Sequence, residues 1–144
     1  YTLNGFPIHK KDFQTADFWA HTNRLKREGE LFDCIFLDPP FFADTNKGRV
    51  DLNQNSAKLI NKVRPLIADG GYLVAINNAL FVSGAEYVQT LEELCKDGYL
   101  EIEQFIPVPE DFTGYAGTRV GNPPVDPVPF NHSTKIAVLK VKRK

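Results

Sequence analysis

Apolar, strand-like runs alternate with helix-like segments along the whole chain, and this alternation limits the fold more than any other feature. Residues 31–38 (LFDCIFLD) form one such run, and residues 72–76 (YLVAI) form another. Continuous apolar runs of this length are typical of parallel strands that are covered on both faces. Between them, apolar side chains recur at helical spacing. The alternation predicts an α/β fold with a mostly parallel sheet.

The other elements follow from the same patterns. The predicted helices cover residues 15–29, 51–71 and 84–98. The further predicted strands cover residues 7–13, 99–107 and 133–142. Gly29 and Gly98 are expected to end their helices, and Pro65 is expected to shorten the last turns of its helix. No helix separates the last two strands, so we expect an antiparallel C-terminal pair.

Composition excludes little. The chain has 144 residues and a net charge of −1, which favours neither a nucleic-acid partner nor its absence. Its apolar runs are too short to span a membrane, and we expect no membrane partner. Cys34 and Cys95 have no metal-ligand spacing, so we expect core residues in a reducing, cytoplasmic setting. Because the chain has no methionine, even at position 1, we expect it to be part of a longer protein.

Polar side chains follow three of the predicted strands at their carboxyl ends, where open α/β sheets bind ligands. These are Asp12, Asp38 and Asn77. If the strands are neighbours, the three groups would form the rim of one site. The alternative interpretation is that the two aspartates cap helices or turns.

The sequence after Asp38 strengthens the interpretation as a site. Pro39 and Pro40 fix the backbone and remove two N–H donors, which leaves a stiff edge of hydrogen-bond acceptors. Phe41 adds a flat apolar surface beside it. An acceptor edge next to a stacking surface suits a planar group with an N–H donor, such as the exocyclic amine of a nucleobase.

These residues resemble a known family. FDCIFLDPPFF (residues 32–42) is similar to motif IV, [D/N/S]-P-P-[Y/F/W], of the class I S-adenosylmethionine-dependent methyltransferases. TLNGFPIHKKDF (residues 2–13) and LIADGGYLVAINN (residues 66–78) resemble further segments of that family, in the same order. Over all 144 residues the chain resembles the ribosomal RNA large-subunit methyltransferases of the 5-methylcytosine type. The resemblance implies a Rossmann-like class I methyltransferase sheet.

The resemblance also implies an activity and a site. The protein would transfer a methyl group from S-adenosylmethionine to a nucleobase of RNA, without a metal. Asp12 would accept a hydrogen bond from the adenine amine, with Phe13 packed on the ring, while residues 38–41 would line the methyl-transfer centre and Asp38 would also contact the cofactor. The substrate side would include Phe42, Asn77 and Asn78.

The chain departs from the family in its glycine-rich cofactor loop, which is absent. In the family that loop follows the first strand, so we expect residues 1–144 to be the C-terminal portion of a single catalytic domain. The N-terminal strands would be missing from the sheet, and the N-terminal half of the same protein would be a required partner. We therefore expect residues 1–144 to bind the cofactor poorly on their own.

The cysteines bear on which atom is methylated. Methylation of C5 of a pyrimidine needs a cysteine nucleophile, because that carbon is not nucleophilic by itself. Cys34 lies four residues before Asp38, about 13 Å along a strand, and Cys95 lies on the packing face of a helix. Neither is placed for attack, so we expect N-methylation, with C5-methylation as the alternative.

Two other classes of protein remain open at this stage. Asp38 after an apolar strand also resembles the metal-binding acid of nucleotide hydrolases, and a non-catalytic α/β module could end a strand in the same way. A glycine-rich loop upstream would distinguish the methyltransferase from both.

The proline-rich residues 107–131 are predicted to form a long loop that borders the substrate entrance. Its possible stacking or phosphate contacts are Phe112, Tyr115, Arg119 and Phe130.

Overall fold

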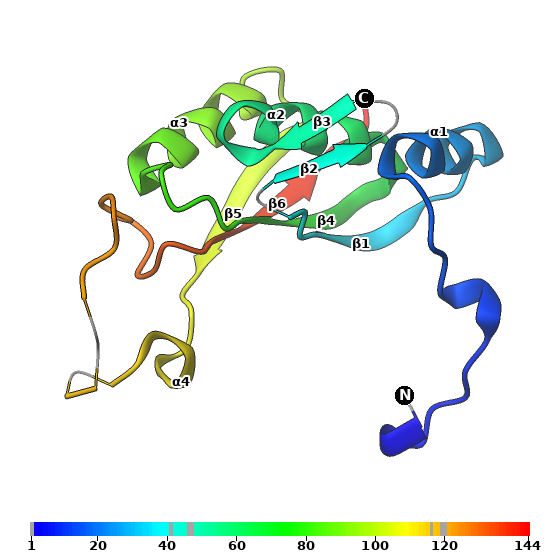
Figure 1. Ribbon diagram of the computed structural model, residues 1–144. Helices are drawn as coiled ribbons and strands as arrows, with labels where there is room; N and C mark the ends of the chain where they lie inside the picture. Colours follow the sequence, from blue (N-terminus) through cyan, green and yellow to red (C-terminus); the bar gives the residue numbers. More distant parts are fainter. Residues whose placement is uncertain (1, 41, 46–47, 116, 119–120) are drawn as a thin grey trace.

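A four-stranded mixed sheet forms the centre of the computed structural model (Figure 1). The structure describes residues 2–40, 42–45, 48–115, 117–118 and 121–144. The strands lie in the order β1 (Phe32–Leu37), β4 (Ile67–Asn77), β6 (Lys135–Val141) and β5 (Leu100–Ile106). β1 is parallel to β4, and β6 is antiparallel to both of its neighbours. Three strands therefore run in one direction, and the predicted mostly parallel sheet with an antiparallel C-terminal pair is confirmed.

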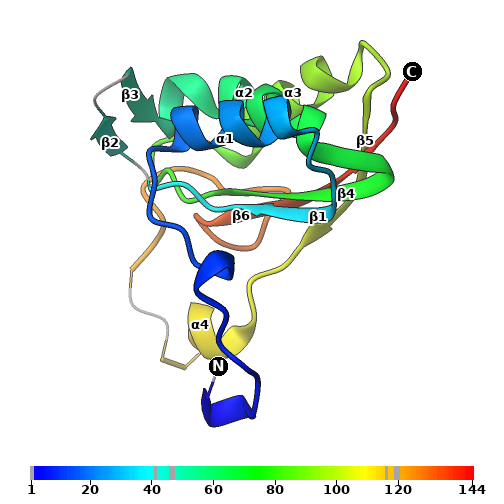
Figure 2. The ribbon, with the colours of Figure 1, turned by 90° about the vertical axis from the view of Figure 1, so that its right-hand side faces the viewer.

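Three helices cover one face of this sheet, as Figures 1 and 2 show: α1 (Phe18–Glu28), α2 (Leu52–Val63) and α3 (Gly84–Cys95). The helix α1 begins at Phe18 rather than at the predicted residue 15, and Asp17 caps it by accepting a hydrogen bond from the backbone N–H of Ala20 at 2.9 Å. Gly29 ends the helix in the left-handed conformation with φ 72°, as predicted. The core between helices and sheet includes Leu37, Leu59, Leu73, Tyr87, Leu91 and Leu139.

The opposite face of the sheet has no helix packed against it among the described residues, and Figure 2 shows α1, α2 and α3 together on the other side. Phe36 of β1 is 73% exposed there, and Cys34 is exposed. The predictions that this strand is covered on both faces and that Cys34 is a core residue are therefore wrong for the described chain. Cys95 is partly buried against the core, as expected.

The predicted strand at residues 7–13 is also wrong. The N-terminal segment instead contains two short 3-10 helices, Thr2–Asn4 and Lys10–Asp12, and runs away from the sheet (Figure 1). A strand needs a neighbour to satisfy its backbone hydrogen bonds, and the described chain places none beside this segment.

Two further features differ from the pattern-based expectations. A hairpin of β2 (Phe42–Thr45) and β3 (Gly48–Asp51) follows β1, where no strands were predicted. The helix predicted for residues 51–71 ends early: α2 stops at Val63, a 3-10 turn with Pro65 follows at Arg64–Leu66, and β4 begins at Ile67. Pro65 has no N–H to continue the helix, which explains the early end.

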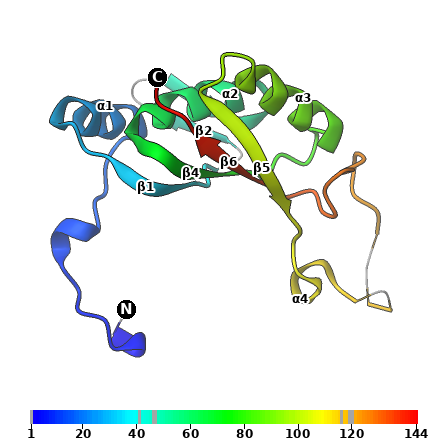
Figure 3. The same cartoon turned by 180° about the vertical axis from the view of Figure 1, so that it is seen from behind.

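The proline-rich loop between β5 and β6 contains the short helix α4 (Glu110–Thr113) and hangs below the sheet (Figure 3). Two hydrogen bonds between Asn131 and Val108 join the two ends of this loop. The Asn131 Oδ1 accepts from the Val108 N–H at 2.9 Å, and the Asn131 Nδ2 donates to the Val108 carbonyl at 2.8 Å. Phe130 is buried against Tyr87 and Phe105, so the prediction that it is a surface stacking residue is wrong. Phe112 and Tyr115 are exposed, and Arg119 lies outside the described residues.

We predict that Gly84→Ala destabilises the fold. Gly84 starts α3 beneath the loop, and an added Cβ would lie 1.9 Å from the carbonyl oxygen of Pro127. Backbone must move to relieve that contact, at a cost of about 1–3 kcal/mol. Gly117→Ala is the matched control, because a Cβ there meets nothing within 4 Å. Chemical denaturation of both variants measures the difference, and equal free energies of unfolding would contradict the predicted packing.

Candidate functional site

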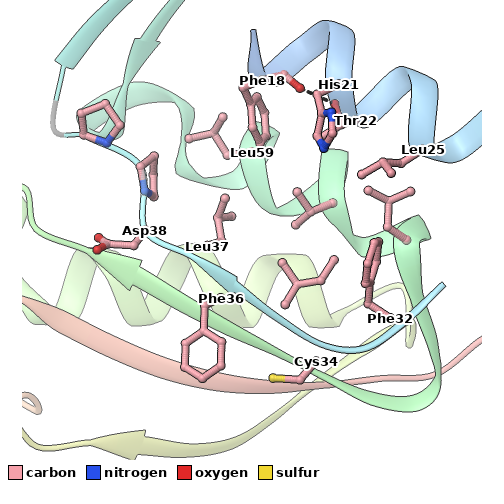
Figure 4. A pocket seen from close by; sticks show the side chains of 15 residues that line it. Phe18, His21, Thr22, Leu25, Phe32, Cys34, Phe36, Leu37, Asp38 and Leu59 are labelled. Carbon is pink, nitrogen blue, oxygen red and sulfur yellow. Dashed lines mark hydrogen bonds between the residues drawn. The ribbon is translucent and has the colours of Figure 1, made fainter. Parts of the chain in front are cut away.

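The carboxyl end of β1 lies beside a largely apolar cavity of about 580 Å³ (Figure 4). The cavity lies between α1, β1 and α2, and its lining includes Phe18, Leu25, Phe32, Leu37 and Leu59. Figure 4 shows the side chain of Leu37 pointing from β1 toward Leu59 of α2, whereas the Asp38 carboxylate points away from α1. The buried side chain of Leu37 thus anchors the strand at the residue before the acid.

Asp38 is exposed at this strand end. Its carboxylate has no hydrogen bond or ion pair to any residue that the structure describes. Among the described residues, Asp38 therefore makes no hydrogen bond of the kind that a helix cap or turn cap makes. Pro39 and Pro40 follow directly and also line the cavity. An acceptor without an intramolecular partner, on a stiff turn, is available to a ligand.

Asn77 and Asn78 lie on the neighbouring strand end. The register pairs Leu37 of β1 with Ala75 of β4, so Asp38 and Asn77 lie at the same edge of the sheet, as predicted. Asn77 is only 1% exposed, and its Oδ1 accepts a hydrogen bond from the Ala79 N–H at 2.9 Å. Its Nδ2, and the Oδ1 of Asn78, are buried without a partner among the described residues. In this structure Asn77 shapes the turn after β4.

The sequence patterns missed Lys135, which is fully buried beside this turn. It faces Asn77 in the β4–β6 register, and its Nζ donates to the carbonyls of Ala79 at 2.9 Å and Ser133 at 2.5 Å. Burial lowers the pKa of Lys135 to about 8, although the Glu86 carboxylate opposes that shift. A neutral amine keeps two N–H donors, enough for both carbonyls. Lys135 therefore ties together the segments that follow β4 and precede β6. A lysine at the start of a strand gives no local signal of burial.

The remaining predicted site residues are not brought to this edge by the described chain. Asp12 and Phe13 are exposed in and after the second 3-10 helix, and neither lines the cavity beside Asp38. Phe41 lies outside the described residues, and for Phe42 only the backbone, at the start of β2, is described. The roles assigned to these residues stay predictions.

Neither a metal centre nor a membrane segment is found in the described chain. No group of three or more His, Cys, Asp or Glu side chains among these residues could hold a metal ion. No helix within the described ranges is long and apolar enough to cross a membrane.

Curated relatives are similar over much of this chain. The ribosomal RNA large subunit methyltransferase I of Erwinia tasmaniensis is 29% identical over 111 residues, which are 72% of this chain and 26% of the relative. The putative ribosomal RNA large subunit methyltransferase YwbD of Bacillus subtilis is 26% identical over 129 residues, 84% of this chain and 32% of the relative. The chain thus spans about a quarter to a third of the length of these relatives. No family model matches it.

Solved structures show the same fold. A putative methyltransferase, SMU.776, complexed with SAH has a TM-score of 0.68 and 22% identity, with 88% of this chain and 30% of that chain covered. A putative SAM-dependent methyltransferase from Streptococcus mutans has a TM-score of 0.64, 19% identity and the same coverage. The resemblance indicated by the motif at residues 38–41 is therefore confirmed: this chain is similar in sequence to the ribosomal RNA large subunit methyltransferases and shares its fold with solved methyltransferases.

Proposed function

We propose that residues 1–144 are the C-terminal portion of a methyltransferase catalytic domain that transfers a methyl group from S-adenosylmethionine to a nucleobase of ribosomal RNA. The observation that carries this proposal is the strand end at Asp38. Its carboxylate has no partner among the described residues, and it is followed by the stiff Pro39–Pro40 turn. The names of the relatives support the reaction and the kind of substrate.

The described residues fit the cofactor in part. Asp38 offers a carboxylate that has no partner in the described chain, at the edge where α/β sheets bind ligands. The neighbour SMU.776 was solved with SAH, which supports the same cofactor here. Asp12 and Phe13 would contact the adenine only if their segment were held beside the sheet, and it is not so held by the described residues. We therefore propose that the rest of the protein positions them.

The free edge of β1 supports such a missing part. β1 is the outermost strand of the described sheet, and its Phe36 and Cys34 are exposed. An exposed apolar edge strand is a site for strand pairing, and natural proteins usually cover it. The relatives are three to four times as long as the part that they share with this chain. We propose that N-terminal strands of the intact protein pair with β1 and that the same segment carries the cofactor loop.

The cysteines support methylation at nitrogen. Cys34 lies four residues before Asp38 on β1, about 13 Å from the strand end, and points with Phe36 to the open face (Figure 4). Burial raises the pKa of the Cys95 thiol, which disfavours the nucleophilic thiolate. Neither cysteine is placed to attack a pyrimidine ring.

The protein's task in N-methylation would be placement. S-adenosylmethionine supplies an activated methyl group when it is bound. Asp38 and the carbonyls of its proline turn would accept hydrogen bonds from the base amine and orient its nitrogen. The same acceptors would stabilise the positive charge that develops on that nitrogen.

We predict that Asp38→Ala lowers kcat about 10²–10³-fold, because an acceptor that strengthens in the transition state is lost. Asp33→Ala is the matched control, because Asp33 lies on the same strand at its far end and is exposed. Transfer of labelled methyl from S-adenosylmethionine to unmodified large-subunit ribosomal RNA by the intact protein measures both. Full activity in a folded Asp38→Ala variant would exclude the proposed site.

Replacing either cysteine distinguishes N-methylation from C5-methylation. We expect Cys34→Ala and Cys95→Ala to keep kcat within a few-fold of the wild-type value, because N-methylation forms no covalent bond to the enzyme. Cys34→Ala should also leave the stability of residues 1–144 on their own unchanged, since its side chain is exposed there. The same transfer assay measures activity, and circular dichroism checks the fold. A well-folded variant without activity would restore the C5 mechanism.

We also predict that the part outside residues 1–144 is required for cofactor binding. Calorimetric titration with S-adenosylhomocysteine should give measurable affinity for the intact protein and little for residues 1–144, because Asp12 and Phe13 are not held near Asp38 by the described chain. Equal affinity for the two proteins would refute this division of the site.

A further inference from the structure

The turn between β4 and α3 carries two large apolar side chains on its surface. Leu80 is 49% exposed and Phe81 is 65% exposed. The turn starts at the carboxyl end of β4, next to the end of β1 that carries Asp38. Exposed aromatic side chains at a ligand-binding edge are common contacts for planar ligands.

Three hydrogen bonds fix this turn. Within the turn, Ala79 donates its N–H to Asn77 Oδ1 at 2.9 Å, and its carbonyl accepts from the Val82 N–H at 3.5 Å. From β6, Lys135 donates to the same carbonyl at 2.9 Å.

The far side of the turn is closed by the start of α3. Ser83 and Glu86 form a capping box, in which Glu86 Oε2 accepts from the Ser83 N–H at 2.8 Å and the Ser83 hydroxyl accepts from the Glu86 N–H at 3.2 Å. The two exposed residues therefore lie on a backbone that is held at both ends.

Resting on the proposed function, we propose that Phe81 is a further substrate-binding residue, which stacks on a base of the RNA beside the methylated one. Stacking accepts any base, because every base has a flat face, and it needs no hydrogen-bonding partner from the protein. A rigid turn loses little conformational freedom when the base binds, so the contact adds to affinity at low entropic cost. Lys135 is then a positioning residue, which acts on the RNA through the turn.

The first experiment measures RNA binding directly. Fluorescence anisotropy of a labelled single-stranded RNA oligonucleotide, with the intact protein saturated with S-adenosylhomocysteine, gives the Kd. Phe81→Ala is expected to raise this Kd by about 5- to 150-fold, the equivalent of one lost stacking contact. Phe81→Trp should restore binding because it keeps an aromatic face. The Kd for S-adenosylhomocysteine should stay unchanged in both variants.

Tyr99→Ala is the matched control, because Tyr99 is an aromatic residue that is 36% exposed and precedes β5 at the opposite edge of the sheet. Its Kd for the oligonucleotide should equal that of the wild type. If Phe81→Ala leaves the Kd unchanged but lowers the Tm of the intact protein, Phe81 packs against another part of the protein and the proposal is wrong. If the wild-type protein binds the oligonucleotide but transfers no methyl group, the proposed function fails while the stacking contact stands.

A double-mutant cycle tests the role of Lys135. Lys135→Met keeps a long side chain but removes the hydrogen bonds that Lys135 donates to the carbonyls of Ala79 and Ser133. It should raise the Kd for the oligonucleotide, and the double variant with Phe81→Ala should bind no more weakly than Phe81→Ala alone. Independent, additive effects would show that Lys135 does not act through the turn. If Lys135→Met fails to fold, the Phe81 variants still decide the main proposal.

Discussion

The pairing of β4 with both of its neighbours is the interaction on which the rest of this structure depends. Its parallel register with β1 brings Asp38 beside Asn77, and its six antiparallel pairs with β6 place Lys135 opposite the same residue. A slip of one residue on either side would turn the buried side chains of β4 to the open face. The backbone pairing of β4 with β1 and with β6 therefore fixes the relative positions of Asp38, Asn77 and Lys135.

Local patterns predicted most of the sheet and the helices α1, α2 and α3, because each of these segments carries its own apolar periodicity. The predicted strand at residues 7–13 failed for a non-local reason: its pattern was compatible with a strand, but no neighbour pairs with it in the described chain. The exposure of Cys34 has the same origin. An apolar run predicts a strand, and whether its second face is covered depends on other segments.

The placement of the candidate site residues was predicted in outline and not in detail, and their roles stay predictions. Asp38 and its prolines were identified because rigid turns and a carboxylate have direct local consequences. The burial of Asn77 and Lys135 could not be predicted, since it depends on the register between strands 58 residues apart in the chain. Phe130 was assigned to the surface because it lies in a proline-rich loop, but its ring fills a space between Tyr87 and Phe105.

The two hydrogen bonds between the Asn131 side chain and the Val108 backbone hold the ends of the loop together next to the sheet. Because these two hydrogen bonds join the chain where it leaves β5 to the chain where it approaches β6, the exposed residues of the loop between them can change in number without altering the strand pairing. Doubling such a loop costs only about 0.6 kcal/mol of closure entropy. Insertions in the exposed part of this loop would therefore cost little stability, so the segment below the sheet can change in length without disturbing the strands above it.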